Sequence, residues 1–202
     1  REPLIRTVNA RIPACPIGEA LSECQCVRQA LGTQTEIPLS VAASLHRRLE
    51  EFGRRGNFVL CGDRLLSIRR EDAPVYVLAF DIGTTTVVSY LLDGKTGRQV
   101  SVSSVLNPQT AYGGDVISRS EYDVSHGDGK LTARIRAALR SLTEENCEKA
   151  GIASEDICFA AIVGNTCMQH LYLGVSPESL LCAPYTATVD ELQLLPAASL
   201  GL

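Results

Sequence analysis

The segment "FDIGTTT", residues 80–86, places an acid, a glycine and three hydroxyls at one point of the chain. Because Gly83 has no side chain, a phosphate can approach the backbone closely there. Asp81 follows an apolar run and can hold a hydrated Mg²⁺ as an outer-shell ligand, since Mg²⁺ keeps most of its water. The segment therefore predicts a site for a nucleotide phosphate and its metal, with Asp81 on the metal. The predicted cofactor-binding residues are Asp81, Gly83, Thr84, Thr85 and Thr86.

This segment differs from the common phosphate-binding motifs. The pattern GxxxxGK[ST] is absent, and the turn is expected to lead into a strand and not a helix. The dinucleotide fingerprint GxGxxG is absent as well. The alternative is a plain hairpin with β-branched threonines, but D-x-G-T-T-T is not a preferred two-residue hairpin loop. We favour phosphate binding over the plain hairpin because of the order of elements that follows.

A second candidate segment is "GNT", which ends a predicted strand and begins a predicted helix. Either Asn165 or Thr166 is a natural residue for capping that helix. The free backbone N–H groups of such a junction can also bind an anion. Capping and lining of the cleft are compatible, so Gly164, Asn165 and Thr166 are also predicted to bind the cofactor.

Two further groups of polar residues lie between these segments. Asp115 and Arg119 are four residues apart, on one face if their segment is helical. The catalytic interpretation puts Asp115 on the metal or on a catalytic water, and Arg119 at a phosphate or a partner surface. The alternative is an ordinary ion pair within a helix. Asn107 and Gln109 flank a proline, and we favour capping of the following turn over contact with a ligand.

The eight cysteines do not form a recognisable metal motif. Cys24 and Cys26 make a CxC pair, with Cys15 upstream, whereas plant-type iron–sulfur clusters use C-x4-C-x2-C and a distant fourth cysteine. We therefore favour reduced, partly buried thiols over a metal site, which is typical of a cytoplasmic protein. The three histidines are scattered, and no combined His/Cys ligand set is visible.

The elements expected to position these residues divide the chain near Pro74. Residues 1–73 predict a small α/β domain with a strand, two helices and a hairpin about Gly62-Asp63. Residues 74–202 predict three consecutive antiparallel strands, a long helix, a fourth strand and a short helix, in the order β-β-β-α-β-α. The expected strands and helices lie at 4–12, 16–32, 38–56 and 57–72 in the first part, and at 75–83, 84–99, 100–107, 131–151, 156–165 and 166–174 in the second.

Composition limits the classes of partner. The chain has 202 residues, 45% of them hydrophobic, and a net charge of −4. A basic surplus typical of nucleic-acid binding is missing, and no apolar run approaches the about 18–20 residues that cross a bilayer. The first residue is Arg1 and the last segment is "LPAASLGL". We interpret the sequence as a piece of a longer protein.

Longer motifs carry a family resemblance. "FDIGTTT" followed by strands resembles the first phosphate loop of the actin, sugar-kinase and heat-shock-chaperone (ASKHA) superfamily. "NPQTAYGGDVISRS" at 107–120, "VGNTCMQHLYLG" at 163–174 and "CAPYTA" at 182–187 resemble the reductive activators of corrinoid proteins. The resemblance is strong over residues 75–188. It implies a fold in which 74–202 form the first half of an actin-like, ribonuclease H-like core, and 1–73 a preceding middle domain.

The resemblance also implies a function. Activators of this family carry a two-iron two-sulfur cluster on a separate domain, and use ATP with Mg²⁺ to reduce a Co(II) corrinoid to Co(I). The implied partners are a nucleotide and a corrinoid protein, and a homodimer is left open. The iron–sulfur domain and the second half of the core are missing here, so this chain alone is not expected to be a working ATPase. Two alternatives stay open: a small-molecule kinase of the same superfamily, and a non-enzymatic nucleotide-gated switch.

Overall fold

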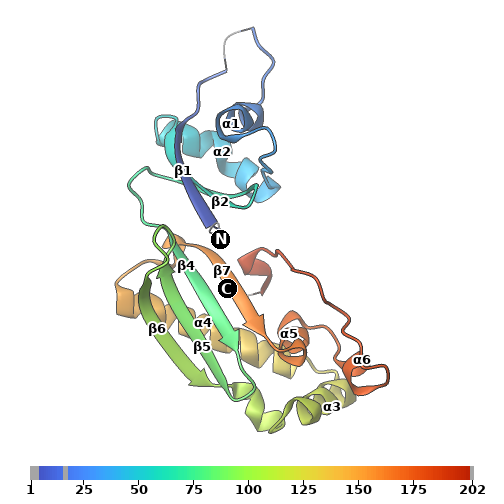
Figure 1. Ribbon diagram of the computed structural model, residues 1–202. Coiled ribbons are helices and arrows are strands. Elements are labelled where there is room, and N and C mark those ends of the chain that lie inside the picture. Colours follow the sequence, from blue (N-terminus) through green and yellow to red (C-terminus); the bar gives the residue numbers. More distant parts are fainter. Residues whose placement is uncertain (1–4, 16–17, 201–202) are drawn as a thin grey trace. The chain divides into compact units, whose positions relative to one another are not determined.

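The computed structural model describes residues 5–15 and 18–200 (Figure 1). The chain divides into two compact units. The first takes residues up to Tyr76 together with Asp93–Arg98, and the second takes Val77–Leu92 and the chain from Gln99 onward. Within the described ranges, no helix is both long enough and apolar enough to cross a membrane.

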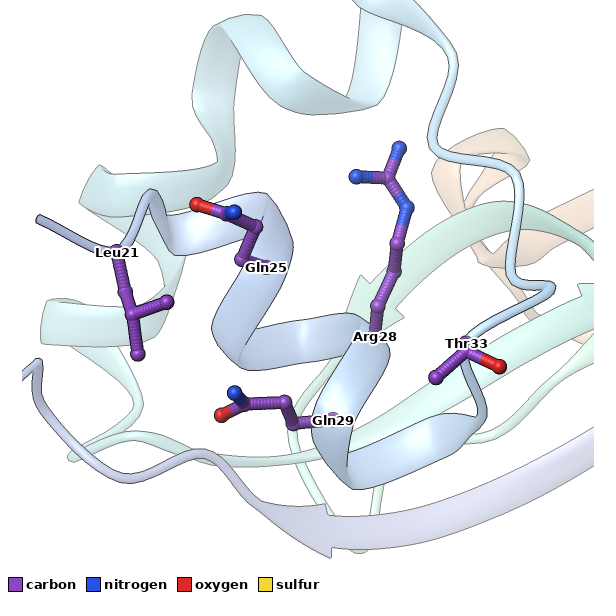
Figure 2. A pocket seen from close by; sticks show the side chains of 5 residues that line it. All are labelled: Leu21, Gln25, Arg28, Gln29 and Thr33. Atoms are coloured by element: carbon purple, nitrogen blue, oxygen red, sulfur yellow. The ribbon is translucent and has the colours of Figure 1, made fainter.

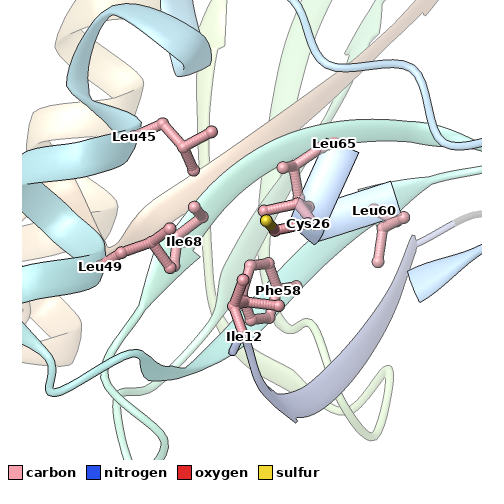
Figure 3. Packing of buried hydrophobic residues seen from close by; sticks show 9 residues of the cluster. Ile12, Cys26, Leu45, Leu49, Phe58, Leu60, Leu65 and Ile68 are labelled. Atoms are coloured by element: carbon pink, nitrogen blue, oxygen red, sulfur yellow. The ribbon is translucent and has the colours of Figure 1, made fainter. Parts of the chain in front are cut away.

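The first unit is a three-stranded antiparallel sheet with two helices. The sheet has the order β1-β2-β3. Its apolar side chains pack against those of the helices, as Figure 3 shows for Ile68 of β3 and Leu49 of α2. The predicted hairpin is confirmed, with Gly62 at a positive φ of 56° between β2 and β3. The elements are β1 (Ile5–Arg11), α1 (Glu23–Leu31), α2 (Leu39–Glu51), β2 (Arg55–Cys61) and β3 (Arg64–Arg69).

Helix α1 is shorter than the sequence predicts. The expected helix covered 16–32, but α1 begins at Glu23; residues 16 and 17 lie outside the described part. Ser22 is the N-cap: its Oγ accepts from the Gln25 N–H at 3.2 Å, and Gln25 Oε1 accepts from the Ser22 N–H at 2.7 Å. This reciprocal pair satisfies two N–H groups that a helix start leaves free, and so fixes the beginning of α1.

Arg54 connects the two helices to the end of β1. Its guanidinium donates to Glu23 Oε2 at 2.8 Å, to Glu50 Oε1 at 2.7 Å and to the Ile12 carbonyl at 3.0 Å. The residue has a positive φ of 59°, which is uncommon for a side chain other than glycine. The hydrogen bond from Arg54 is the main cause that lowers the pKa of Glu23 from its ordinary value. Arg54 is thus the central ionic contact of this unit.

The second unit contains a four-stranded sheet with the order β6-β5-β4-β7. Strands β5 and β6 are antiparallel, and the arrows of β4 and β7 point the same way in Figure 1. The three predicted consecutive strands and the fourth strand are all present. Their bounds are β4 (Tyr76–Ile82), β5 (Thr86–Asp93), β6 (Gln99–Leu106) and β7 (Ile157–Gly164).

The predicted long helix is present as α4 (Lys130–Ala150), and Gly151 ends it in the left-handed conformation. It packs along this sheet. Its buried apolar side chains are Leu131, Ile135, Leu139, Leu142 and Cys147. Asn146 lies on the same buried face. Its Nδ2 donates to Ser89 Oγ at 2.9 Å, and its Oδ1 accepts from Ser101 Oγ at 2.6 Å. Because buried polar groups need partners, these bonds fix the register of α4 against β5 and β6.

The structure adds elements between β6 and α4 and near the end of the chain. A 3₁₀ helix, η1 (Pro108–Tyr112), and the helix α3 (Val116–His126) precede α4. The predicted short helix is present as α5 (Thr166–Leu173) and ends at Gly174. The other additions are η2 (Ser154–Asp156), α6 (Glu178–Leu181) and η3 (Ala197–Leu200).

Replacing Arg54 by alanine should lower the free energy of unfolding of the first unit by about 2–3 kcal/mol, because two carboxylates lose a charged donor. Urea unfolding at pH 7 measures this. Arg70→Ala is the matched control, since its pair with Glu51 is exposed and should contribute about 0–1 kcal/mol.

The pKa of Glu23 is lowered in the folded state, so its contribution to the stability is present above its ordinary pKa of 4.5 and is lost as the pH falls through the folded value. The difference between the wild type and Arg54→Ala should therefore shrink in acid; a constant difference down to pH 3 would contradict this account.

Candidate functional site

The turn between β4 and β5 is too tight for a side chain at its glycine. The Gly83 N–H donates to the Thr86 carbonyl at 3.0 Å. A Cβ built on Gly83 would lie 2.6 Å from that carbonyl oxygen, closer than real Cβ contacts. Among the described residues, the N–H groups of Thr84 and Thr85 have no hydrogen-bond acceptor. Asp81, at the end of β4, has an exposed side chain. The turn thus presents free N–H groups, a hydroxyl and a carboxylate.

Asn107, directly after β6, binds two backbone carbonyl groups of this turn. Its side chain is fully buried. Its N–H donates to the Thr85 carbonyl at 2.8 Å, and its Nδ2 donates to the Gly83 carbonyl at 2.8 Å. Its Oδ1 accepts from the Gln109 N–H at 3.0 Å, which confirms the predicted capping of η1. The contact with the turn was not predicted, and the only signal in the sequence is the position of an asparagine at a strand end before proline.

The junction of β7 and α5 lies beside the same turn. Asn165, and not Thr166, is the N-cap of α5, with Oδ1 accepting from the Met168 N–H at 3.0 Å. Its Nδ2 donates to Thr84 Oγ1 at 3.2 Å. A Cβ on Gly164 would lie 3.0 Å from the Ile82 carbonyl oxygen, so the two strand ends approach closely. The structure therefore brings together the two segments that the sequence predicted separately.

Asp115 and Arg119 have different partners. Asp115 is the N-cap of α3, where its Oδ1 accepts from the Ser118 N–H at 2.8 Å and from Ser118 Oγ at 3.0 Å. The backbone bond from Ser118 is the main cause that lowers the pKa of Asp115. Arg119 is fully buried and donates from Nε to the Gly113 carbonyl at 2.8 Å. A role of Asp115 at the metal stays a prediction, since its observed contacts are those of a helix cap.

The first unit offers two weaker candidates. Glu23, His46 and Glu50 bring their ligand atoms within 4.8 Å of one another, but the guanidinium of Arg54 already bonds both carboxylates. A pocket of about 200 Å³ lies beside α1 (Figure 2). Its polar lining serves the helix itself, because Gln25 completes the N-cap of α1 and Arg28 Nε donates to the Thr35 carbonyl at 3.1 Å. We assign no site to either candidate.

All eight cysteines are free thiols, and none is in a disulfide. Cys26, Cys61, Cys147 and Cys167 are buried, and Cys182 is exposed. Burial raises the pKa of Cys167, whose Sγ lies 3.1 Å from Ser120 Oγ. A raised pKa leaves the thiol protonated and weakly nucleophilic. Cys167 is therefore a packing residue between α5 and α3.

The second unit is thus an α/β half-domain in which the β4–β5 turn and the start of α5 meet at one end of the sheet. Residues 76–202 match the family model described as the RACo middle region. This chain belongs to that family, and the predicted relation to reductive activators of corrinoid proteins is confirmed.

Two known proteins are similar to the chain. The corrinoid activation enzyme RamQ of Eubacterium limosum is 37% identical over 139 residues, which cover 65% of this chain and 23% of RamQ. The solved structure of a reductive activator for a corrinoid, iron-sulfur protein superposes with a TM-score of 0.85 at 26% identity, over 98% of this chain and 34% of that one. The chain therefore spans about a quarter to a third of these relatives. The superposition confirms the predicted fold class, a small α/β domain followed by a partial ASKHA-like half-domain.

Gly83→Ala should lower the free energy of unfolding by about 1–3 kcal/mol, because the added methyl group meets the Thr86 carbonyl and the turn must shift. Denaturant unfolding of the second unit measures this. Gly114→Ala is the matched control, since no atom lies within 4 Å of the added Cβ, and its effect should stay within about 0.5 kcal/mol. Equal stability of the two variants would show that the turn has room for a side chain.

Proposed function

We propose that this chain is part of an ATP-dependent reductive activator that reduces the Co(II) corrinoid of a methyl-transfer protein to Co(I). The observation that carries the proposal is the contact between Asn165 and Thr84, which joins the β4 turn to the start of α5. The same end of the sheet carries the Asp81 carboxylate, the N–H groups of Thr84 and Thr85, and the Thr84 hydroxyl. Membership of the RACo family and the similarity to RamQ support the same reading.

The turn fits the phosphates of a nucleotide. The N–H groups of Thr84 and Thr85, which have no acceptor among the described residues, can donate to a phosphate oxygen. The missing side chain of Gly83 serves the turn itself, because the Thr86 carbonyl occupies the place of a Cβ. The Thr84 hydroxyl is fixed by Asn165 and adds a third donor. Asp81 would hold a hydrated Mg²⁺. ATP, when bound, supplies the free energy that an uphill electron transfer needs.

The electron source belongs to another part of the longer protein. By the family resemblance it is a two-iron two-sulfur cluster, and a second lobe completes the adenosine pocket. The role of this chain is then to bind the phosphates and couple them to the rest of the protein. The partners in this proposal are the nucleotide and the corrinoid protein.

Two other functions use the same turn. A small-molecule kinase of the superfamily would transfer the terminal phosphate to a substrate, and a nucleotide-gated switch would bind ATP without redox chemistry. A redox-active iron–sulfur centre on the full-length protein separates the activator from both. The cheapest discriminating observation is the coding sequence on either side of this segment.

The full-length protein should reduce its Co(II) corrinoid partner to Co(I) only with ATP and Mg²⁺, and Asp81→Asn should slow that reaction by about 10–100-fold, as loss of a metal-orienting group typically does. The absorbance of the corrinoid follows the reaction. Thr84→Val keeps the shape but removes a hydroxyl, and should cost about two- to tenfold. Asp72→Asn, an exposed acid in the first unit, is the control. Unchanged ATP affinity and unchanged rates in Asp81→Asn would sink the phosphate assignment, and phosphoryl transfer without reduction would favour the kinase.

The 202-residue chain alone should bind ATP weakly, with a dissociation constant above about 1 mM, because one lobe supplies only part of the contacts that micromolar binding needs. Isothermal titration with Mg-ATP measures this, and the full-length protein is the reference. Micromolar affinity of the isolated chain would mean that the second lobe contributes little to nucleotide binding.

A further inference from the structure

Among the described residues, Arg119 has the largest fully buried side chain, and its guanidinium makes no ion pair with a carboxylate there. Its Nε donates to the Gly113 carbonyl at 2.8 Å, and its Nη1 lies 3.6 Å from Met168 Sδ. Its Nη2 has no hydrogen-bond partner within the part of the chain that the structure describes. Asp115, four residues before Arg119, is exposed and caps α3. A thioether is a weak acceptor, so this guanidinium is left under-satisfied in the interior.

Met168 connects Arg119 to the turn between β4 and β5, residues 83–86, which is called the phosphate turn below because the proposed function places a phosphate there. The same Sδ lies 3.6 Å from Asn107 Nδ2, which also donates to the Gly83 carbonyl at 2.8 Å. All three side chains, from α3, α5 and the end of β6, are fully buried. A continuous path of three contacts therefore leads from Arg119 through Met168 and Asn107 to the backbone of Gly83. This set, Arg119, Met168 and Asn107, is called the buried relay below.

We propose that Arg119 is a positioning residue for the phosphate turn and acts through the buried relay. This inference rests on the proposed nucleotide site and names a residue that the site needs but that does not touch the ligand. The guanidinium fixes the Met168 side chain, Met168 fixes the Asn107 amide, and that amide holds the Gly83 carbonyl. With that carbonyl held, the N–H groups of Thr84 and Thr85 keep the orientation that a phosphate requires.

A purely structural role would not explain a cation at this position. Replacing a buried charged group by a well-packed apolar one is often neutral or stabilising. Burial is the main cause that lowers the pKa of Arg119, which shows that the surroundings disfavour its charge. A positive charge in a low-dielectric interior also acts over a longer range than one at the surface. Residues 81–86 contain no Lys or Arg. The positive charge of Arg119 therefore favours the binding of an anion at this turn.

The test uses the full-length protein and measures the Michaelis constant for ATP, the turnover number and the melting temperature. Arg119→Met keeps much of the volume and removes the charge, Arg119→Lys keeps the charge, and Met168→Leu removes the sulfur while conserving volume. Arg119→Met should raise the Michaelis constant for ATP by about three- to tenfold with a smaller change in turnover, as mutations along coupled networks do. Its melting temperature should stay within a few degrees. Arg119→Lys should restore part of the ATP affinity.

The double variant Arg119→Met/Met168→Leu should bind ATP about as well as Arg119→Met alone, because both changes break the same path. Arg136→Met is the matched control. This arginine also bonds carbonyls of α5, those of Tyr172 and Leu173, but at the opposite end from Asn165. It should lower the melting temperature and leave the Michaelis constant for ATP unchanged.

The outcomes separate this inference from the proposed function. If the wild type does not bind ATP, the proposed function fails and the relay fails with it. If Asp81→Asn loses ATP binding while Arg119→Met and Met168→Leu bind as the wild type does, the site stands and the relay is overturned. Should Arg119→Met fail to fold, Met168→Leu and Arg119→Lys decide: wild-type Michaelis constants in both overturn the relay, and raised values support it.

Discussion

Two hydrogen bonds from Asn107 to the turn after β4 determine how that turn can meet a ligand. They engage the carbonyls of Gly83 and Thr85 on one side, while the N–H groups of Thr84 and Thr85 stay free of protein acceptors among the described residues. The asparagine can do this because it is fully buried and its Oδ1 is also satisfied, by the Gln109 N–H. A satisfied polar network in the interior is stiff, since breaking one bond leaves a buried group without a partner. The turn is therefore held in a fixed conformation before any ligand arrives.

Two glycines, Gly83 and Gly164, also restrict the conformation of this turn. A Cβ on Gly83 would lie 2.6 Å from the Thr86 carbonyl oxygen, which excludes a side chain, and a Cβ on Gly164 would make a tight contact of 3.0 Å with the Ile82 carbonyl oxygen. Close backbone approach leaves little room for the strand ends to shift. Since residues 81–86 contain no Lys or Arg, the turn itself offers a phosphate only neutral donors. In the proposed function, the negative charge of the phosphate would then be balanced by a metal ion at Asp81 and by positive charges outside the turn.

The sequence predicted the parts of this molecule that depend on local pattern. Apolar runs separated by short turns identified the strands of the second unit. One apolar face and a terminal glycine identified α4, and a terminal glycine identified α5. Local pattern failed where a polar interaction decided the outcome. The start of α1 depends on the reciprocal bonds of Ser22 and Gln25, and α3 depends on a capping aspartate that was interpreted as catalytic or ion-paired. The hydrogen bond from Asn107 to the Gly83 carbonyl joins residues 24 positions apart. Local secondary-structure propensity carries no information on such a contact.

Arg54 and Arg119 show why burial of an arginine needs to be judged by its partners. Arg54 donates to two carboxylates and two backbone carbonyl groups, so its charge is compensated within the first unit. Its role is to hold α1, α2 and the end of β1 together. Arg119 has one carbonyl, one sulfur and an unpaired Nη2. An interior charge without a counter-charge in direct contact costs free energy, and the exposed Asp115 compensates the charge of Arg119 only in part. A further negative group within its field would offset more of that cost. The phosphate turn, three contacts away through Met168 and Asn107, is the place in this unit where the proposed function brings such a group.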